Sequence, residues 1–133
     1  MDNQQIIKKI ALDTLVLESK SIFNLSKIID SNFCKIIDSL KACVGKIIIT
    51  GIGKSAIIGM KISATLNSTG SKSIFLHLGE ALHGDIGVIG KDDIVICISK
   101  SGQSIEIESL SIHLNNLGVQ SVSYTHLTLP TSR

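Results

Sequence analysis

Two segments of the chain share one design, in which an apolar run leads into a loop of small residues. The run 46–50 leads into Gly51-Ile-Gly-Lys-Ser55, and the run 94–98 leads into Ser99-Lys-Ser-Gly-Gln-Ser104. Each loop is followed by a stretch with helical spacing, so each segment predicts a strand, a tight loop and a helix. Backbone N–H groups, hydroxyls and a lysine at a helix N-terminus favour an anion. Two such loops in register predict a pocket for a small phosphorylated ligand.

The spacing of apolar residues predicts the remaining elements. Helices are expected over 4–25, 32–43, 55–68 and 104–117, and strands over 46–50, 73–76, 94–98 and 119–122. Continuous Ile/Val strands that alternate with helices predict an α/β fold, a three-layer sandwich with a parallel sheet, preceded by two helices. Those first two helices are expected to form a packing or dimer-forming arm, with ordinary core helices as the alternative. Ligands of such sheets bind beyond the carboxyl ends of the strands.

The last residues differ in composition from the rest. They contain the only tyrosine, Tyr124, and the only proline, Pro130. We therefore expect a helical arm over 1–45, a partial α/β domain over 46–122 and a non-native tail over 123–133. The alternative is a natural strand with a ragged end.

Composition excludes several classes of protein. The 133 residues carry a formal net charge of +2 and only 3% aromatic residues, which argues against a nucleic-acid partner. No apolar run approaches the roughly 20 residues of a membrane span, and the N-terminus lacks the pattern of a signal peptide. The cysteines, Cys34, Cys43 and Cys97, form no CxxC pair, and Cys97 is expected in the core. These features predict a cytoplasmic protein with no membrane partner.

The first loop admits more than one interpretation. It lacks the first glycine of a Walker A motif, because Ile48 occupies that position. A dinucleotide-binding fingerprint is met formally by Gly51, Gly53 and Ala56, although Glu80 lies late for the expected acidic residue. A dinucleotide-binding domain therefore stays open as an alternative, as does a plain strand–helix turn.

The second loop and the segment before it are rich in polar groups. Ser99, Ser101 and Ser104 surround Gly102, and Ser104 is the expected N-cap of the following helix. Glu106 is expected to point towards the ligand, and Glu108 towards solvent. The segment 77–85 holds two histidines, a glutamate and an aspartate without metal-binding spacing, so its polar groups are expected to line a sugar site. His113 is expected at the surface of its helix.

These motifs together resemble one family. Thr50-Gly-Ile-Gly-Lys-Ser55, Ser68-Thr-Gly70, Gly79-Glu-Ala-Leu-His-Gly-Asp85 and Ile98-Ser-Lys-Ser-Gly-Gln-Ser104 resemble the sugar isomerase (SIS) domain, in its arabinose 5-phosphate isomerase branch. The resemblance implies an aldose–ketose isomerase that interconverts ribulose 5-phosphate and arabinose 5-phosphate through an enediolate. It implies no cofactor and no metal. The product would enter synthesis of 3-deoxy-manno-octulosonate, a lipopolysaccharide precursor.

The resemblance also implies roles for individual residues. Lys54, Glu106 and His83 would be catalytic. The substrate would be bound by Gly51, Gly53, Ser55, Glu80, Ser99, Ser101, Gly102, Gln103 and Ser104. Gln103 stands where the family usually has glutamate.

The family pattern extends further than the matched motifs. It continues with another βαβ stretch that carries a catalytic Glu and a His, often with paired CBS domains, and its members form homo-oligomers, typically tetramers. We therefore expect this chain alone to be inactive and prone to aggregate through an exposed edge at 94–98 or 119–122. The alternatives are a non-catalytic SIS module that senses a sugar phosphate, an isomerase of another phosphosugar, and the dinucleotide-binding domain.

Overall fold

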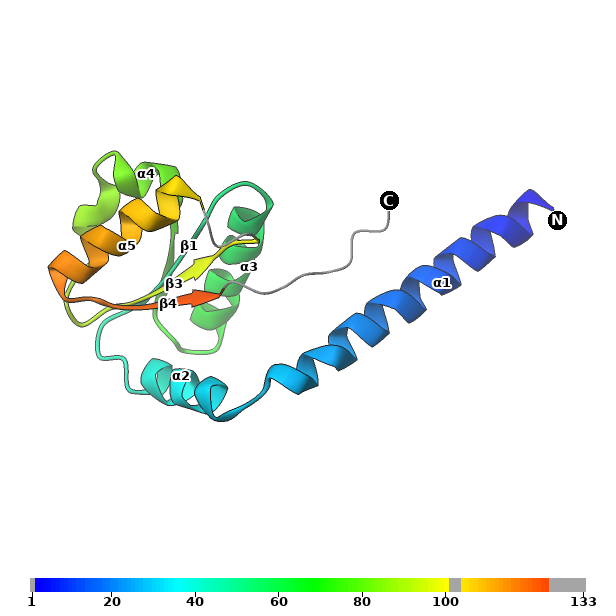
Figure 1. The fold of residues 1–133 in the computed structure, drawn as a ribbon, viewed down its shortest axis with the longest axis horizontal. Coiled ribbons are helices and arrows are strands. Elements are labelled where there is room, and N and C mark those ends of the chain that lie inside the picture. Colours follow the sequence, from blue (N-terminus) through cyan, green and yellow to red (C-terminus); the bar gives the residue numbers. More distant parts are fainter. Residues whose placement is uncertain (1, 101–103, 125–133) are drawn as a thin grey trace. The chain divides into compact units, whose positions relative to one another are not determined.

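The computed structural model describes residues 2–100 and 104–124 (Figure 1). Contacts along the chain divide it into two units, one ending at Ile37 and the other beginning at Asp38. No helix of the described residues is long and apolar enough to cross a membrane.

The first unit is helical. It contains α1 (Asn3–Asn24), the 3-10 turn η1 (Leu25–Ile28) and most of α2 (Ser31–Lys41). The Asp30 carboxylate accepts hydrogen bonds from the N–H groups of Asn32 and Phe33, both at 2.9 Å, and so satisfies the open first turn of α2. α1 has no buried side chain although apolar residues fill it. Both helices were predicted within two residues at each end.

The second unit contains a parallel four-stranded sheet. Its strands are β1 (Ile47–Gly51), β2 (Ser73–His77), β3 (Ile94–Ile98) and β4 (Gln120–Tyr124), in the spatial order β2-β1-β3-β4. β1 is buried at every position, as its unbroken apolar run predicts. The predicted α/β fold with a parallel sheet, preceded by two helices, is therefore confirmed. The expectation that 94–98 could be an exposed edge was wrong, because β3 is paired on both sides. Only β2 and β4 are edges of the described sheet.

Helices cover the sheet on both faces (Figure 1). One face carries α3 (Lys54–Ser68), and the other carries α4 (Leu78–Leu82), the 3-10 turn η2 (Asp85–Val88) and α5 (Ile105–Leu117). α3 turns its small residues Ala56, Gly59 and Ser63 inward. A Cβ at Gly59 would lie only 2.9 Å from Cε2 of Phe75, so glycine is what allows α3 to approach β2.

The main core lies between the sheet and the α4–α5 layer. Its buried members are Ile48, Leu76, Leu78, Ala81, Ile89, Val95, Cys97, Ile107, Leu110, Leu114 and Val119. Burial raises the pKa of the Cys97 thiol, so this cysteine packs as an apolar side chain, as expected. Gly118 ends α5 in the left-handed region at φ 68°, and the N–H of Val119 reaches the carbonyl of Leu114 at 3.0 Å.

The edge strand β2 is joined to α3 by a side chain. The Asn67 amide donates to the Ser73 carbonyl at 2.8 Å and accepts from the Ser73 N–H at 2.8 Å. Asn67 therefore occupies the hydrogen-bonding groups of Ser73 much as a neighbouring strand would. The Ser73 hydroxyl also bonds that of Ser63 at 3.0 Å inside the protein.

We expect Asn67→Ala to lower the free energy of unfolding by about 1–3 kcal/mol, because two polar groups of Ser73 lose their partners. Urea unfolding of the two chains measures the difference. Asn116→Ala is the matched control, because Asn116 is an exposed residue of α5. Equal losses in both variants would contradict a special role for Asn67.

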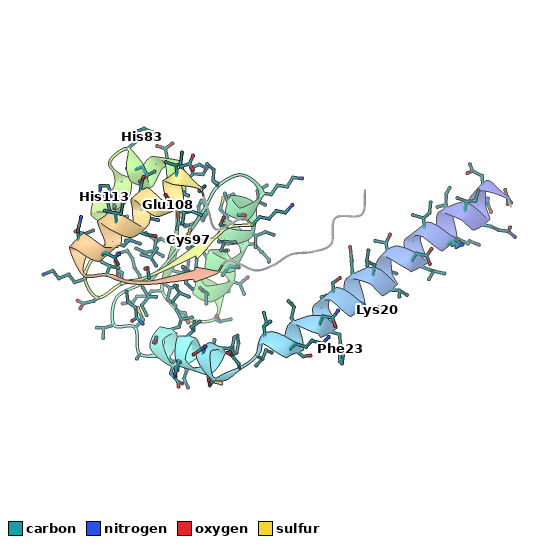
Figure 2. All side chains as sticks on the ribbon, in the orientation of Figure 1. Lys20, Phe23, His83, Cys97, Glu108 and His113 are labelled. Atoms are coloured by element: carbon teal, nitrogen blue, oxygen red, sulfur yellow. The ribbon has the colours of Figure 1, made fainter. Side chains whose placement is uncertain are left out.

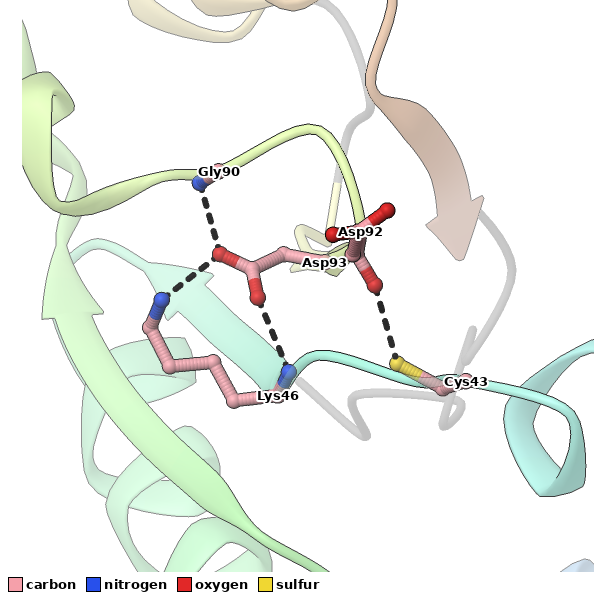
Figure 3. Close-up of polar contacts among 5 residues, drawn as sticks. All are labelled: Cys43, Lys46, Gly90, Asp92 and Asp93. Atoms are coloured by element: carbon pink, nitrogen blue, oxygen red, sulfur yellow. Dashed lines mark hydrogen bonds and ion pairs between the residues drawn. The ribbon is translucent and has the colours of Figure 1, made fainter.

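The opposite, amino-terminal edge of the sheet is closed by Asp93 (Figure 3). Its carboxylate accepts from the backbone N–H of Lys46 at 2.8 Å, from Lys46 Nζ at 2.6 Å and from the N–H of Gly90 at 2.7 Å. Asp93 is only 5% exposed. Gly45 completes the contact, because its N–H donates to the Asp92 carbonyl at 3.0 Å and a Cβ there would collide with Asp93. The loops before β1 and β3 are thus held together by one carboxylate.

Candidate functional site

The strand register brings three loops to one edge of the sheet. Gly51 at the end of β1 lies opposite His77 at the end of β2 and Ile98 at the end of β3. Because all strands are parallel, the segments that follow them begin side by side. These segments are the ones that the sequence singled out, so the predicted convergence of the loops is confirmed.

The loop after β1 is tight and presents a lysine. A Cβ at Gly51 would lie 3.1 Å from the Ile98 carbonyl oxygen and 3.2 Å from backbone atoms of Ser55, so the chain passes closely between β3 and α3. Gly53 has φ 59° and ψ −131°, which other residues rarely adopt, and this turn places Lys54 as the first residue of α3. The Lys54 side chain is exposed, and Ser55 is half-buried.

The segment after β2 forms α4, a short helix in the layer beside α5. His77 is its N-cap, and the His77 Nδ1 accepts a hydrogen bond from the Gly79 N–H at 3.2 Å. Glu80 lies in the first turn and His83 at the C-cap, and both are exposed. Figure 2 shows His83 at the outer end of α4, in the same layer as Glu108 and His113 of α5. His113 is exposed, as predicted.

The loop after β3 leads into the N-terminus of α5. Ser104 is the N-cap, and its hydroxyl accepts from the Ile107 N–H at 3.4 Å, as the sequence predicted. Glu106 lies in the first turn and is half-buried, and Ser99 is half-buried with a polar partner. Ser101, Gly102 and Gln103 lie outside the described residues.

The ends of three helices thus surround the carboxyl edge, but their ionisable groups are not paired with one another. Among residues 2–100 and 104–124, no ion pair joins Lys54 to Glu80 or Glu106. The same residues contain no cluster of His, Cys, Asp and Glu suited to a metal ion. Lysine, glutamate and histidine presented separately around one edge can supply a cation, a base and a hydrogen-bond donor to a small polar molecule.

Two hollows of the second unit lie away from this edge. One of about 430 Å³ and one of about 320 Å³ flank Cys43 and Val44 at the amino-terminal edge of the sheet. They contain none of the predicted site residues. We therefore place the candidate site by strand register and glycine geometry rather than by cavity size.

Two residues of this edge were not predicted in their observed roles. Thr50 is fully buried, and its hydroxyl has no hydrogen-bond partner among the described residues. The sequence feature that could have pointed to Thr50 is a polar residue at the end of an otherwise apolar run. The sequence predicted His77 only as part of a polar segment, whereas it caps the helix α4. The glycine two residues later could have indicated this cap, because its N–H is the group that His77 binds.

Comparison with known proteins assigns the chain. The family model described as "SIS domain" matches residues 42–129, which include all three loops at the carboxyl edge. The chain belongs to the SIS domain family. The resemblance inferred from the motifs is thereby confirmed. β4 ends at Tyr124, two residues beyond the end predicted for that strand.

Similar proteins carry consistent names. The chain is 44% identical over 117 residues to a probable arabinose 5-phosphate isomerase of Haemophilus influenzae, covering 88% of this chain and 35% of the relative. It is 43% identical over 114 residues to the arabinose 5-phosphate isomerase KpsF of Escherichia coli CFT073, covering 85% and 35%. This SIS chain therefore spans about a third of the length of the curated relatives it matches.

A solved structure extends the likeness to three dimensions. The E. coli CFT073 protein c3406, determined in complex with arabinose 5-phosphate, superposes with a TM-score of 0.85 at 39% identity. The superposition covers 97% of this chain and 70% of that one. The SIS fold implied by the resemblance of the motifs is thus found in a protein that binds a sugar phosphate.

Proposed function

We propose that this SIS chain provides the sugar-phosphate-binding part of an arabinose 5-phosphate isomerase. The observation that supports the proposal is the position of Lys54, Glu80 and Ser104 at the starts of three helices that follow one sheet edge, in a chain 41–44% identical to isomerases of that name. The complex of c3406 with arabinose 5-phosphate supports the same ligand. We further propose a cytoplasmic homo-oligomer that needs neither metal nor cofactor and has no nucleic-acid or membrane partner.

The chemistry of this proposal is a proton transfer. A base removes the proton from C2 of the open-chain aldose while negative charge develops on O1. A proton then passes from the C2 hydroxyl to O1, and the enediolate, now charged on O2, is protonated at C1 to give the ketose. Lys54 stabilises the oxyanion, because it is a cation at the first position of α3, directly after the turn that follows β1. Glu106 is the proposed base, and Glu80 and His83 border the sugar and assist ring opening.

The phosphate is bound at the same edge. Ser55, Ser99, Ser101 and Ser104 supply hydroxyls, and Gly51, Gly53, Gly102 and Gln103 supply close backbone or amide contact. The N-terminus of α3, which has no side-chain cap, adds N–H donors for an anion, and the first turn of α5 lies at the same edge. Residues 1–45 remain proposed as a helical arm of the oligomer, and 123–133 as a non-native tail.

We expect the 133-residue chain to bind D-arabinose 5-phosphate with a Kd on the order of 1 mM or tighter. In amide NMR spectra, the sugar phosphate should shift the signals of 53–55 and 104–107 more than those of the amino-terminal edge. Arabinose without phosphate should bind at least about 10-fold more weakly, because the charged phosphate contacts are lost. Tighter binding of NAD than of the sugar phosphate would contradict the proposal and favour a dinucleotide-binding domain.

Catalysis is tested in a chimera, because the chain covers 70% of c3406. Residues 1–117 of this chain replace the matching segment of c3406, and ribulose 5-phosphate formation is measured. We expect activity within about 100-fold of the parent, because side chains at the new junction pack differently from those of c3406 and can shift the site. A folded chimera that binds the sugar phosphate but is inactive would favour the non-catalytic sensor instead.

A further inference from the structure

His77 contacts the first turn of α4 in a way that specifies its tautomer. The residue ends β2 with φ −64° and ψ 130°, and its Nδ1 accepts the Gly79 N–H at 3.2 Å. Because a backbone N–H can only donate, Nδ1 carries no hydrogen in this arrangement. The neutral imidazole therefore carries its hydrogen on Nε2.

The His77 ring also packs against an aromatic side chain. The rings of Phe75 and His77 meet edge to face, with centroids 6.4 Å apart at 76°. Phe75 in turn lies against α3, because a Cβ added to Gly59 would come within 2.9 Å of the Phe75 ring. A continuous line of contacts thus runs from α3 through Phe75 and His77 to α4.

Gly79 leaves room for the imidazole. A Cβ at Gly79 would lie 3.3 Å from His77 Nδ1 and 3.5 Å from Cε1. The first distance is shorter than ordinary contacts, so a side chain there would require the ring to shift by a few tenths of an ångström. The glycine and the histidine therefore depend on each other.

α4 depends strongly on this contact because it has only five residues. A helix of about one turn gains little from its own hydrogen bonds, since nucleation is unfavourable. Its orientation must be set by contacts with the rest of the protein. Leu78 and Ala81 anchor it in the core, and His77 joins it to the strand.

We propose that His77 is a positioning residue of the isomerase, which holds α4, with Glu80 and His83, in place relative to α3, with Lys54. This inference rests on the proposed function, and it adds a residue that contacts neither phosphate nor sugar in that proposal. His77 acts through the Gly79 hydrogen bond and the Phe75 ring.

The first test measures the position of α4 in the 133-residue chain. His77→Leu removes the acceptor, and His77→Asn keeps one on a shorter side chain. We expect the Gly79 amide to exchange with solvent at least about 10-fold faster in His77→Leu, and within about 3-fold of wild type in His77→Asn. The NMR signals of His83 should move in the leucine variant only. The control is His113→Leu, since His113 is an exposed residue of α5.

Nitrogen NMR spectra of the imidazole show directly which ring nitrogen carries the hydrogen. We expect His77 of the wild-type chain to show an unprotonated Nδ1 and a protonated Nε2. The opposite tautomer, or equal Gly79 exchange in wild type and His77→Leu, would overturn the inference.

The second test measures the ligand. We expect His77→Leu to weaken binding of D-arabinose 5-phosphate by about 10-fold, while His77→Asn and His113→Leu stay within about 2-fold, as scaled by the free energy of one hydrogen bond. Unchanged binding in His77→Leu would overturn the positioning role while leaving the proposed function intact. If the wild-type chain itself does not bind, the proposed function is contradicted, and the exchange measurement alone then decides whether His77 positions α4.

Discussion

Replacing Lys54 with alanine is expected to reduce kcat/KM of the chimera by about 100-fold to 1,000-fold, the loss typical of one group that stabilises an oxyanion. Lys54 is the first residue of α3, and the turn at Gly53 presents its exposed side chain at the carboxyl edge. Negative charge develops on the sugar oxygen only during the reaction, so most of the loss should fall on kcat. Coupled measurement of ribulose 5-phosphate formation gives both constants.

Two variants make the Lys54 result specific. Lys61→Ala removes an exposed lysine of the same helix. It should leave kcat/KM within about 2-fold, because solvent and salt screen a charge that lies away from the site. Lys54→Arg keeps the charge and should recover part of the activity, although its planar group differs in shape. Full activity in Lys54→Ala would show that the lysine has no catalytic role, even if the chimera binds the sugar phosphate.

Asp93→Ala is expected to lower the free energy of unfolding of the chain by about 3 kcal/mol, which is typical of removing one partner from a buried network. The carboxylate holds two backbone N–H groups and the Lys46 ammonium, and it is 5% exposed. The Lys46 side chain is 31% exposed, so solvent screens its share and the backbone contacts should dominate. Urea unfolding measures the change.

The neighbouring aspartate is the control. Asp92 is exposed, and it contributes its backbone carbonyl, which accepts from the Gly45 N–H at 3.0 Å and from the Cys43 thiol at 3.5 Å. Asp92→Ala retains that carbonyl and should change stability by less than about 0.5 kcal/mol. Equal effects at the two positions would contradict the role assigned to the Asp93 carboxylate.

The same carboxylate predicts how stability depends on pH. Burial by itself would raise the pKa of Asp93, but the hydrogen bonds from Lys46 and Gly90 and the charge of Lys46 outweigh it and hold the pKa below its ordinary value of 3.8. Its contribution is therefore present above pH 3.8 and is lost as pH falls through the lower pKa of the folded state. As the pH falls through that range, the urea midpoint of the wild-type chain should drop. The difference in urea midpoint between the wild-type chain and Asp93→Asn should become smaller over the same range.

Much of the fold followed from local sequence patterns. β3 was predicted at its observed ends because its apolar run is bounded by acidic residues and by a serine-rich loop. Ser104 was predicted as the N-cap of α5, and the helix was predicted to end at 117, just before Gly118, because a capping hydroxyl and a left-handed glycine each act within a few residues. No separate helix was predicted for α4, since five residues carry too little periodicity to distinguish a helix from a loop.

The sequence by itself therefore determined the elements, the parallel sheet, the family and the loops that form the candidate site. Only the tertiary structure decided which side chains join those elements. Asn67 with Ser73, Lys46 with Asp93 and Phe75 with His77 become partners only after strands and helices have packed. Hydrogen bonds and ring contacts need positions correct to a few tenths of an ångström, whereas strand and helix patterns require only the right kind of residue at the right spacing.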